Sequence, residues 1–267
     1  MFTNILKEKL KNDQVVFGTW MVIPSPTLVE IFGLAGMDFV VIDHEHGPFN
    51  YETSENMIRA AENSGCTPLV RVPTNSASDI LRSLEIGAHG IVVPQIENFD
   101  QAYFAIKSMK YAPIGDRGVS AFTRSSNYYG IGEKNRTKKL NDSTLSMLLI
   151  ESVEAINNLD AILECNDVDV IYIGTYDLSQ SLGIIDDVNN EKVLSIIKES
   201  VLKIRKSGIA AGILAQSPED AKKWIDIGVQ FIPYIADCGI IYEGCLLYTS
   251  DAADDLLCVD LGGRRII

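Results

Sequence analysis

The sequence predicts an α/β chain that forms a single (β/α)₈ TIM barrel, and three observations carry this prediction. Eight short runs rich in β-branched residues alternate with amphipathic helical stretches. Several runs, such as FVVID, GIVVP and SMLLIE, are nearly continuous apolar segments, which is typical of parallel strands buried on both faces. Glycine follows many of the helical stretches, where a helix commonly ends. We therefore expect one barrel domain over residues 1–244.

The expected elements follow one another in regular alternation. Strands are expected at residues 16–21, 39–43, 69–72, 90–96, 147–152, 170–174, 210–215 and 230–235. Helices are expected at residues 27–35, 54–64, 78–86, 99–109, 155–165, 192–207 and 218–227, after a charged amphipathic segment at the N-terminus. The longest irregular segment, residues 111–141, lies between the fourth and fifth strands, and a loop of this length is usually functional or mobile.

A doubly wound open sheet is the alternative fold, because the same alternation of strands and helices serves both architectures. Such a sheet usually carries a glycine-rich phosphate-binding loop after its first strand. The residues at that place are MVIPSPT, which contain neither a GxGxxG motif nor a Walker A motif. The barrel is therefore favoured.

Composition and charge narrow the class of protein. Hydrophobic residues make up 46% and charged residues 22% of the 267 residues, as in ordinary globular proteins. Lys and Arg number 23 against 36 Asp and Glu, and the net charge of −13 argues against nucleic acid or anionic membranes as partners. We find no apolar run of the ~18–20 residues of a transmembrane helix, no signal peptide and no CxxC pair. We expect a cytoplasmic protein whose partners are small molecules.

The regular alternation stops at about Cys245. The remaining residues, CLLYTSDAADDLLCVDLGGRRII, closely resemble the conceptual translation of a sequencing-library adapter. We therefore interpret residues 245–267 as a non-native tail produced by read-through and exclude them from the predicted domain. On this interpretation the last helix of the barrel is missing.

Active sites of such barrels lie at the carboxyl ends of the strands, so the polar residues there form the candidate site. These residues are Asp43, His44, Glu45, His46, Arg71, Gln95, Glu97, Glu151, Thr175, Tyr176, Asp177 and Asp237. Glu151 and Asp177 follow neighbouring strands and are suited to hold a hard divalent cation, with water and substrate at its other positions. The alternative for each carboxylate alone is a helix N-cap or a solvated loop position.

Arg71 ends the run TPLVRVP, where a guanidinium offers a planar fork for a substrate carboxylate or a developing enolate. The alternative is a structural ion pair with Glu45, Glu85 or Glu97. His46 lies among acidic residues and is a candidate general base, the alternative being a hydrogen-bonded histidine without a catalytic role.

Two other chemistries find little support in the sequence. His44 and His46 are spaced like the paired zinc ligands of amidohydrolase barrels, but His89, the one further histidine, is expected to precede a strand. A Schiff-base aldolase needs a lysine at a strand end, and every lysine falls in an expected helix or loop. Carbon–carbon bond chemistry would therefore need a metal ion to stabilise the enolate.

Several segments occur in a fixed order along the chain: GTWMVIPSPTLVEIFGLAGMDFVVIDHEHGP, PLVRVP, EIGAHGIVVPQIE, APIGDRGVS, LLIES and IGTYDLSQSLG. Together they resemble the HpcH/HpaI aldolase family, which acts on 2,4-dihydroxyhept-2-ene-1,7-dioate and on 2-keto-3-deoxy sugar acids. The resemblance covers residues 6–242. It implies a barrel of the phosphoenolpyruvate/pyruvate type that binds Mg²⁺, Mn²⁺ or Co²⁺ as a class II aldolase. Such an enzyme reversibly cleaves a 4-hydroxy-2-oxo acid to pyruvate and an aldehyde through an enolate.

The resemblance also implies roles for particular residues. Glu151 and Asp177 match the metal ligands, and Arg71 matches the arginine that holds the keto oxygen and stabilises the enolate. His46, in the stretch Asp43-His44-Glu45-His46, matches the general base, which acts through a bound water. Asp43 matches an acid of the same motif. Glu85 stands where the family usually has an aspartate that tunes the base.

The chain departs from the family at three positions expected near the substrate. Leu149 replaces a glutamine that touches pyruvate, Tyr176 replaces an alanine, and His44 replaces a glycine. Thr175, Tyr176 and Leu149 are therefore expected to shape substrate binding, and the acceptor aldehyde stays open.

Two other functions also stay open. A lyase of the citrate-lyase or malyl-CoA type would use a thioester, but the acidic chain lacks the expected basic cluster. A barrel that binds a keto acid without turnover is the other alternative. By resemblance, the intact protein is a homo-oligomer, a trimer or a hexamer, with the last helix exchanged between subunits.

Overall fold

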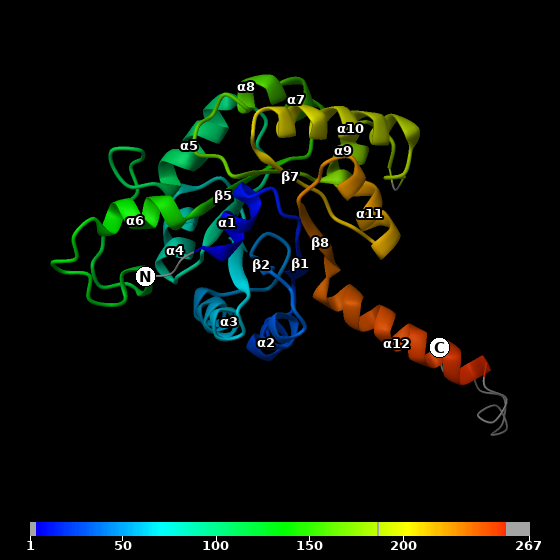
Figure 1. Cartoon of the computed structure of the whole chain (residues 1–267), viewed down its shortest axis with the longest axis horizontal. Helices are drawn as coiled ribbons and strands as arrows, with labels where there is room; N and C mark the ends of the chain where they lie inside the picture. Colours follow the sequence, from blue (N-terminus) through cyan, green and yellow to red (C-terminus); the bar gives the residue numbers. More distant parts are fainter. Residues whose placement is uncertain (1–3, 186, 255–267) are drawn as a thin grey trace.

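Eight parallel strands form a closed barrel in a computed structural model that describes residues 4–185 and 187–254. The strand order is the sequence order, and β8 (Phe231–Ala236) closes the barrel on β1 (Val16–Met21) through pairs such as Val16 with Phe231. Helices surround the strands (Figure 1). The predicted (β/α)₈ barrel is confirmed, and the doubly wound open sheet was the wrong alternative because the sheet has no free edge.

The remaining strands are β2 (Phe39–Asp43), β3 (Thr67–Arg71), β4 (Gly90–Val93), β5 (Leu145–Ile150), β6 (Val170–Ile173) and β7 (Ala210–Gly212). The helices up to β5 are α1 (Ile5–Lys11), α2 (Pro26–Leu34), α3 (Tyr51–Asn63), α4 (Ala77–Glu85), α5 (Phe99–Met109), the 3₁₀ turn η1 (Arg124–Ser126) and α6 (Arg136–Ser143). Those after β5 are α7 (Val153–Asn157), α8 (Leu159–Ile162), α9 (Thr175–Ser181), α10 (Glu191–Lys206), α11 (Pro218–Asp226) and α12 (Asp237–Asp254). Within the described ranges, no helix is long and apolar enough to cross a membrane.

Most expected elements match the structure, with differences that have local causes. The helix expected at 155–165 is divided into α7 and α8 at Asn158, whose side chain donates to the Glu97 carbonyl at 2.9 Å and fixes a non-helical backbone there. The segment expected to be irregular contains η1 and α6. The glycines predicted to end helices, including Gly36 and Gly208, have the positive φ that this role requires.

Apolar side chains fill the interior of the barrel, so a polar site has room only at the ends of the strands. Alternate residues of each strand point inward, and Phe39 stacks on Phe231 with ring centroids 3.9 Å apart. Leu149 belongs to this inner cluster and is 1% exposed. The other residues of each strand pack against the helices in a second, larger cluster. The packed interior leaves the carboxyl ends of the strands as the place for polar chemistry.

Helix α12 leaves the barrel at β8 and extends away from it (Figure 1). Its start is anchored by Asp237, a buried carboxylate that accepts the backbone N–H groups of Val22 at 3.0 Å and Ile23 at 2.9 Å. Apolar side chains farther along it, such as Leu247, are exposed. The division at residue 244 stays a prediction, and residues 255–267 of the predicted tail lie outside the described residues.

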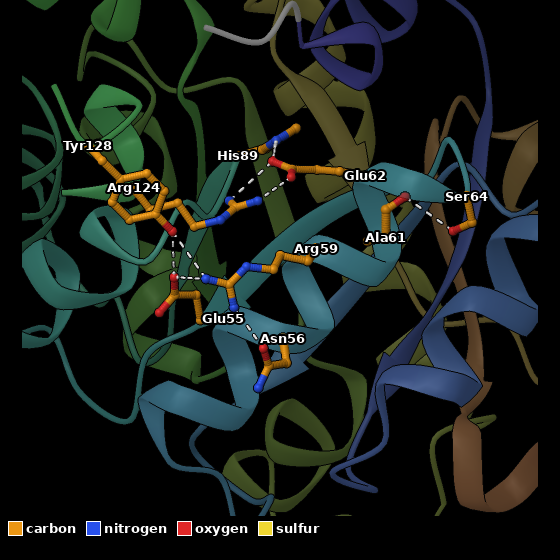
Figure 2. Close-up of polar contacts among 9 residues, drawn as sticks. All are labelled: Glu55, Asn56, Arg59, Ala61, Glu62, Ser64, His89, Arg124 and Tyr128. Atoms are coloured by element: carbon orange, nitrogen blue, oxygen red, sulfur yellow. Dashed lines mark hydrogen bonds and ion pairs between the residues drawn. The ribbon is translucent and has the colours of Figure 1, made fainter. Parts of the chain in front are cut away.

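A network of charged side chains ties the long segment between β4 and β5 to α3 (Figure 2). Glu62 near the end of α3 and His89 before β4 lie at the amino end of the barrel. Glu62 accepts hydrogen bonds from His89 at 2.9 Å and from Arg124. Tyr128 donates to Glu55 at 3.1 Å. Burial alone would raise the pKa of Glu62, but the bonds from His89 and Arg124 lower it to about 2.

We expect Glu62→Gln to lower stability at neutral pH by about 1 kcal/mol, because the pair is partly exposed and therefore screened. The pKa of Glu62 is depressed on folding, so its contribution is complete above the ordinary glutamate pKa and disappears as the pH falls toward 2. Thermal melts at pH 7 and pH 3 should show a destabilisation that shrinks at the lower pH. The matched control is Glu164→Gln at an exposed position, and an equal effect at both pH values would contradict the expectation.

Candidate active site

An ion pair links the ends of β2 and β3. The parallel pairing of β2 with β3 places Asp43 directly beside Arg71. The edge of the guanidinium group faces both carboxylate oxygens of Asp43. Arg71 Nε donates to Asp43 Oδ1 at 2.8 Å, and Nη2 donates to Oδ2 at 2.5 Å. Asp43 is 2% exposed and also accepts the backbone N–H groups of Glu45 at 3.0 Å and His46 at 3.2 Å. One buried carboxylate thus fixes both Arg71 and the turn that carries Glu45 and His46.

Arg71 is held on three sides. Its Nη1 lies 3.0 Å from Glu45 Oε2, and its guanidinium carbon lies 4.5 Å from the centre of the Trp20 ring. Burial would lower the pKa of Arg71, but hydrogen bonding to Asp43 and the charge of Glu45 raise it. Burial raises the pKa of Glu45 despite Arg71 beside it. The structural ion pair that the sequence offered for Arg71 therefore exists with Glu45, and Asp43 is its closer partner.

Glu151 follows β5 and is 9% exposed. Its Oε1 accepts the backbone N–H of Gln95 at 2.8 Å. Burial raises the pKa of Glu151, and the neighbouring charges of Asp177 and Glu45 raise it further. No ion pair to Glu151 or Asp177 occurs in residues 4–185 and 187–254, so this negative charge lacks a cationic side chain of its own.

A hollow of about 360 Å³, here named the catalytic pocket, brings these groups together at the carboxyl ends of the strands. It is lined by Glu45, His46, Gln95, Ile96, Glu97, Gln101, Glu151, Ser152 and Asp177. Asp177 reaches it from the first turn of α9, which begins directly after β6. The predicted pair Glu151 and Asp177 therefore shares one pocket.

The donor set fits a hard divalent cation. Carboxylate oxygens are the ligands that Mg²⁺ and Mn²⁺ prefer, and Mg²⁺ commonly takes one or two carboxylates and fills its other positions with water and substrate. Glu151 and Asp177 supply two such ligands without a competing lysine or arginine within ion-pair distance in the described chain. No group of three or more potential metal-binding side chains occurs among those residues. The site therefore suits a cation that also binds the substrate, rather than a closed structural metal centre.

The three histidines occupy different environments. His46 is exposed and lines the catalytic pocket. The His44 ring stacks on Phe49 and shares a 2.8 Å hydrogen bond with Ser54, while burial lowers its pKa. His89 lies in the Glu62 network at the other end of the barrel (Figure 2). His89 thus lies at the other end of the barrel from His44 and His46, so the three histidines do not meet at one site.

Other predicted site residues lie outside the lining of the catalytic pocket. His44 points toward α3, although it was expected near the substrate, because its aromatic neighbours hold it there. Leu149 is buried within the barrel. Thr175 is 8% exposed, whereas Tyr176 is 54% exposed and accepts a hydrogen bond from Gln216 Nε2.

Glu85 does not line the catalytic pocket. It ends α4, which places it at the amino end of the barrel, close to where β4 begins. Its Oε1 accepts from Arg117 Nη2 at 2.8 Å. The sequence position agreed with the family pattern, but it gave no information on which end of the barrel the residue occupies.

Glu45 and Gln95 make contacts with the catalytic groups to which the sequence analysis assigned no role. Glu45 joins Arg71 to the pocket, and Gln95 holds Glu151 through its backbone. Both stood among the strand-end polar residues, so the signal was present. What the sequence lacked was the backbone geometry, since Gln95 has a left-handed φ of 56° that no residue pattern reveals.

Comparison with known proteins identifies the family. Residues 16–241 match the family described as HpcH/HpaI aldolase/citrate lyase. A curated relative from Escherichia coli O17:K52:H18 (strain UMN026 / ExPEC), named 2-keto-3-deoxy-L-rhamnonate aldolase, is 33% identical over 265 residues. That alignment covers 99% of this chain and 96% of the relative.

Solved structures with the same fold also superpose on this chain. An HpcH/HpaI aldolase/citrate lyase family protein from Burkholderia cenocepacia J2315 superposes with a TM-score of 0.89 at 25% identity, covering 94% of this chain and 100% of the other. The citrate synthase SbnG superposes with a TM-score of 0.84 at 32% identity, covering 94% and 98%. The fold and the family match define a lyase of the aldolase class on a (β/α)₈ barrel. The chain belongs to the HpcH/HpaI aldolase/citrate lyase family, as the sequence motifs predicted, and it is an enzyme of the aldolase class.

Proposed function

We propose that the protein reversibly cleaves a 4-hydroxy-2-oxo acid to pyruvate and an aldehyde, with a divalent cation held by Glu151 and Asp177. In the cleavage direction the C3–C4 bond breaks, the C4 hydroxyl loses its proton to become the aldehyde, and C3 gains a proton to become the pyruvate methyl group. When bound, the cation withdraws electrons from the 2-oxo group, and this chemistry allows the three-carbon fragment to leave as an enolate. Mg²⁺, Mn²⁺ and Co²⁺ are the candidates.

The chain's own residues supply charge and proton transfer. Arg71 lies outside the lining of the catalytic pocket but pairs with Glu45, which lines it, and we expect one of its five N–H groups to bind the keto oxygen as negative charge develops. Asp43 keeps the guanidinium in this orientation. His46 lines the pocket and is the group placed to move the proton of the C4 hydroxyl. Thr175 and Tyr176 precede Asp177 at the start of α9, outside the pocket lining, and we expect them to limit the space for the substrate on that side.

The observation that carries the proposal is the shared pocket of Glu151 and Asp177. Two carboxylates, one of them buried with a raised pKa, face one hollow without a cationic side chain of their own in the described chain. This arrangement is costly without a cation, because burial of an uncompensated carboxylate is unfavourable.

Exchange of deuterium into the pyruvate methyl group, followed by proton NMR, tests the proposal without knowledge of the aldehyde. The protein is incubated with pyruvate in deuterated buffer with Mg²⁺ and then with EDTA. We expect exchange with the metal and loss of exchange with EDTA. A folded protein that leaves the methyl signal intact in both conditions would contradict enolate formation from pyruvate.

A second candidate function follows from the similarity to SbnG, whose name is citrate synthase. A thioester acyl group would then take the place of pyruvate as the carbon nucleophile, in line with the thioester alternative from the sequence. Citrate formation from oxaloacetate and acetyl-CoA, measured beside the exchange assay, separates the two. The proposal also includes a cytoplasmic location and assembly as a trimer or hexamer, which size-exclusion chromatography with light scattering would test.

A further inference from the structure

Tyr172 of β6 brings a hydroxyl group into the inner cluster of the barrel. The other described members of this cluster are apolar, apart from the indole N–H of Trp20. The strand register pairs Tyr172 with Leu149 of β5, and Glu151 is the next inward-facing position after Leu149. The Tyr172 side chain therefore lies in the layer directly beneath Glu151.

The Tyr172 ring crosses the interior of the barrel. It meets the Trp20 ring of β1 edge to face, with centroids 5.5 Å apart, although β1 and β6 are not neighbouring strands. It also meets the Phe231 ring, with centroids 6.4 Å apart. Gly212 of β7 leaves room for the ring, because a Cβ atom at this glycine would lie 2.8 Å from Tyr172 Cδ2. These contacts fix the ring, so its hydroxyl has a defined place.

The charges of Arg71 and Glu151 both act on the Tyr172 hydroxyl. The Arg71 guanidinium carbon lies 4.5 Å from the centre of the Trp20 ring that Tyr172 contacts. Burial raises the pKa of Tyr172, Trp20 and the charge of Arg71 oppose this rise, and the charge of Glu151 adds to it. The hydroxyl thus lies near both the arginine and the carboxylate. A substrate that contacts a cation at Glu151 and also contacts Arg71 occupies the space between them.

The hydroxyl proton of Tyr172 has no acceptor in the part of the chain that the structure describes, residues 4–185 and 187–254. The fully enclosed polar atoms without a partner in these ranges include Tyr111 Oη but not Tyr172 Oη. The Tyr172 side chain keeps 4% of its surface exposed, so a ligand can reach the hydroxyl. Elsewhere the interior contains phenylalanine, as at Phe39 and Phe231, and a hydroxyl in such surroundings is unfavourable unless an acceptor meets it.

We propose that Tyr172 is a further catalytic residue, whose O–H donates a hydrogen bond to the 2-oxo oxygen of the substrate as this oxygen gains negative charge. The inference rests on the proposed function. When the base removes a proton from the pyruvate methyl group, the electron pair of the C–H bond forms the C2–C3 double bond, and the charge moves to the 2-oxo oxygen. Tyr172 keeps its own proton and contacts that oxygen from the interior of the barrel, beside the N–H group of Arg71.

Tyr172→Phe tests this assignment, because it removes the oxygen atom and keeps the ring against Trp20 and Phe231. Deuterium exchange into pyruvate is measured on the full-length protein with Mg²⁺ over a range of pyruvate concentrations. We expect the rate at saturating pyruvate to fall about a hundredfold, as for one donor at a developing negative charge, while KM changes little. Oxalate, whose charged oxygens resemble those of the enolate, should inhibit the variant more weakly by a similar factor.

The matched control is Tyr111→Phe, which removes the hydroxyl of a tyrosine that is 1% exposed and follows α5 at the amino end of the barrel. Its hydroxyl also lacks a partner among the described residues, so the chemical change is the same. Exchange and oxalate inhibition in this variant should match the wild type. Thermal melts establish that both variants are folded.

Three results would overturn the role of Tyr172. The first is wild-type exchange in folded Tyr172→Phe. The second is an equal loss of affinity for pyruvate and oxalate with an unchanged rate at saturation, because the hydroxyl would then contribute to binding and not to the charge of the enolate. The third is failure of the proposed function, which has its own signature: the wild type would show no metal-dependent exchange, and the role of Tyr172 would fall with it.

Discussion

Replacing either Glu151 or Asp177 by its amide should abolish metal-dependent deuterium exchange into pyruvate while the barrel stays folded. Glu151→Gln and Asp177→Asn keep side-chain size and remove one negative charge each, so the cation loses a charged ligand. We expect each variant to lower the exchange rate at saturating pyruvate by about a thousandfold, comparable to the loss of an electrostatic group at a reaction centre. Isothermal titration with Mn²⁺ should show weaker binding in both.

The same substitutions should leave stability unchanged or slightly raised without metal. Glu151 is buried, and burial together with nearby carboxylates raises its pKa, so its charge opposes folding in the absence of a cation. Glu164→Gln, on an exposed carboxylate, is the control for exchange and for metal binding. Wild-type exchange in both Glu151→Gln and Asp177→Asn would exclude these residues as the metal site.

These substitutions test a pair that could be predicted from the sequence for a simple geometric reason. Parallel strands present their carboxyl ends at one edge, so Glu151 after β5 and Asp177 after β6 had to lie near each other once the barrel was predicted. The structure also places Asp43 beside Arg71 at the ends of neighbouring strands, a pair that the sequence analysis did not name. Strand-end residues of a barrel are therefore the part of a site that sequence reasoning reaches best.

Residues at helix ends and on loops could not be placed in this way. Glu85 stands where the family usually has an aspartate, yet the structure places it at the end of α4 in a pair with Arg117. His44 lies one residue beyond a strand, and its direction depends on Phe49 and Ser54, which the strand pattern does not include. The left-handed turn at Gln95 likewise depends on a bond to Glu151 from another strand. In each case a contact with a residue outside the strand or helix concerned decided the orientation.

Arg71→Lys should lower the exchange rate about a hundredfold and lower stability only modestly. Lysine keeps the positive charge beside Asp43 and Glu45 but has no planar fork, so it cannot contact both carboxylates and the keto oxygen together. The expected loss is that of one oriented donor at a developing negative charge. Pyruvate exchange at saturating Mg²⁺ measures it, and a rate equal to the wild type would remove Arg71 from the reaction.

Arg71→Met distinguishes the contribution of Arg71 to folding stability from its contribution to the reaction. Methionine fills the space against Trp20 but leaves the Asp43 carboxylate, which is 2% exposed, without its counter-charge. Breaking a buried pair on one side costs about 3–5 kcal/mol, so thermal melts should show a loss much larger than that of Arg71→Lys. Adding Asp43→Asn should restore much of the stability, because the uncompensated charge is then gone, while exchange stays lost. Recovery of exchange in the double variant would show that Arg71 only holds Asp43 in the fold, whereas stability without exchange assigns its guanidinium to the reaction itself.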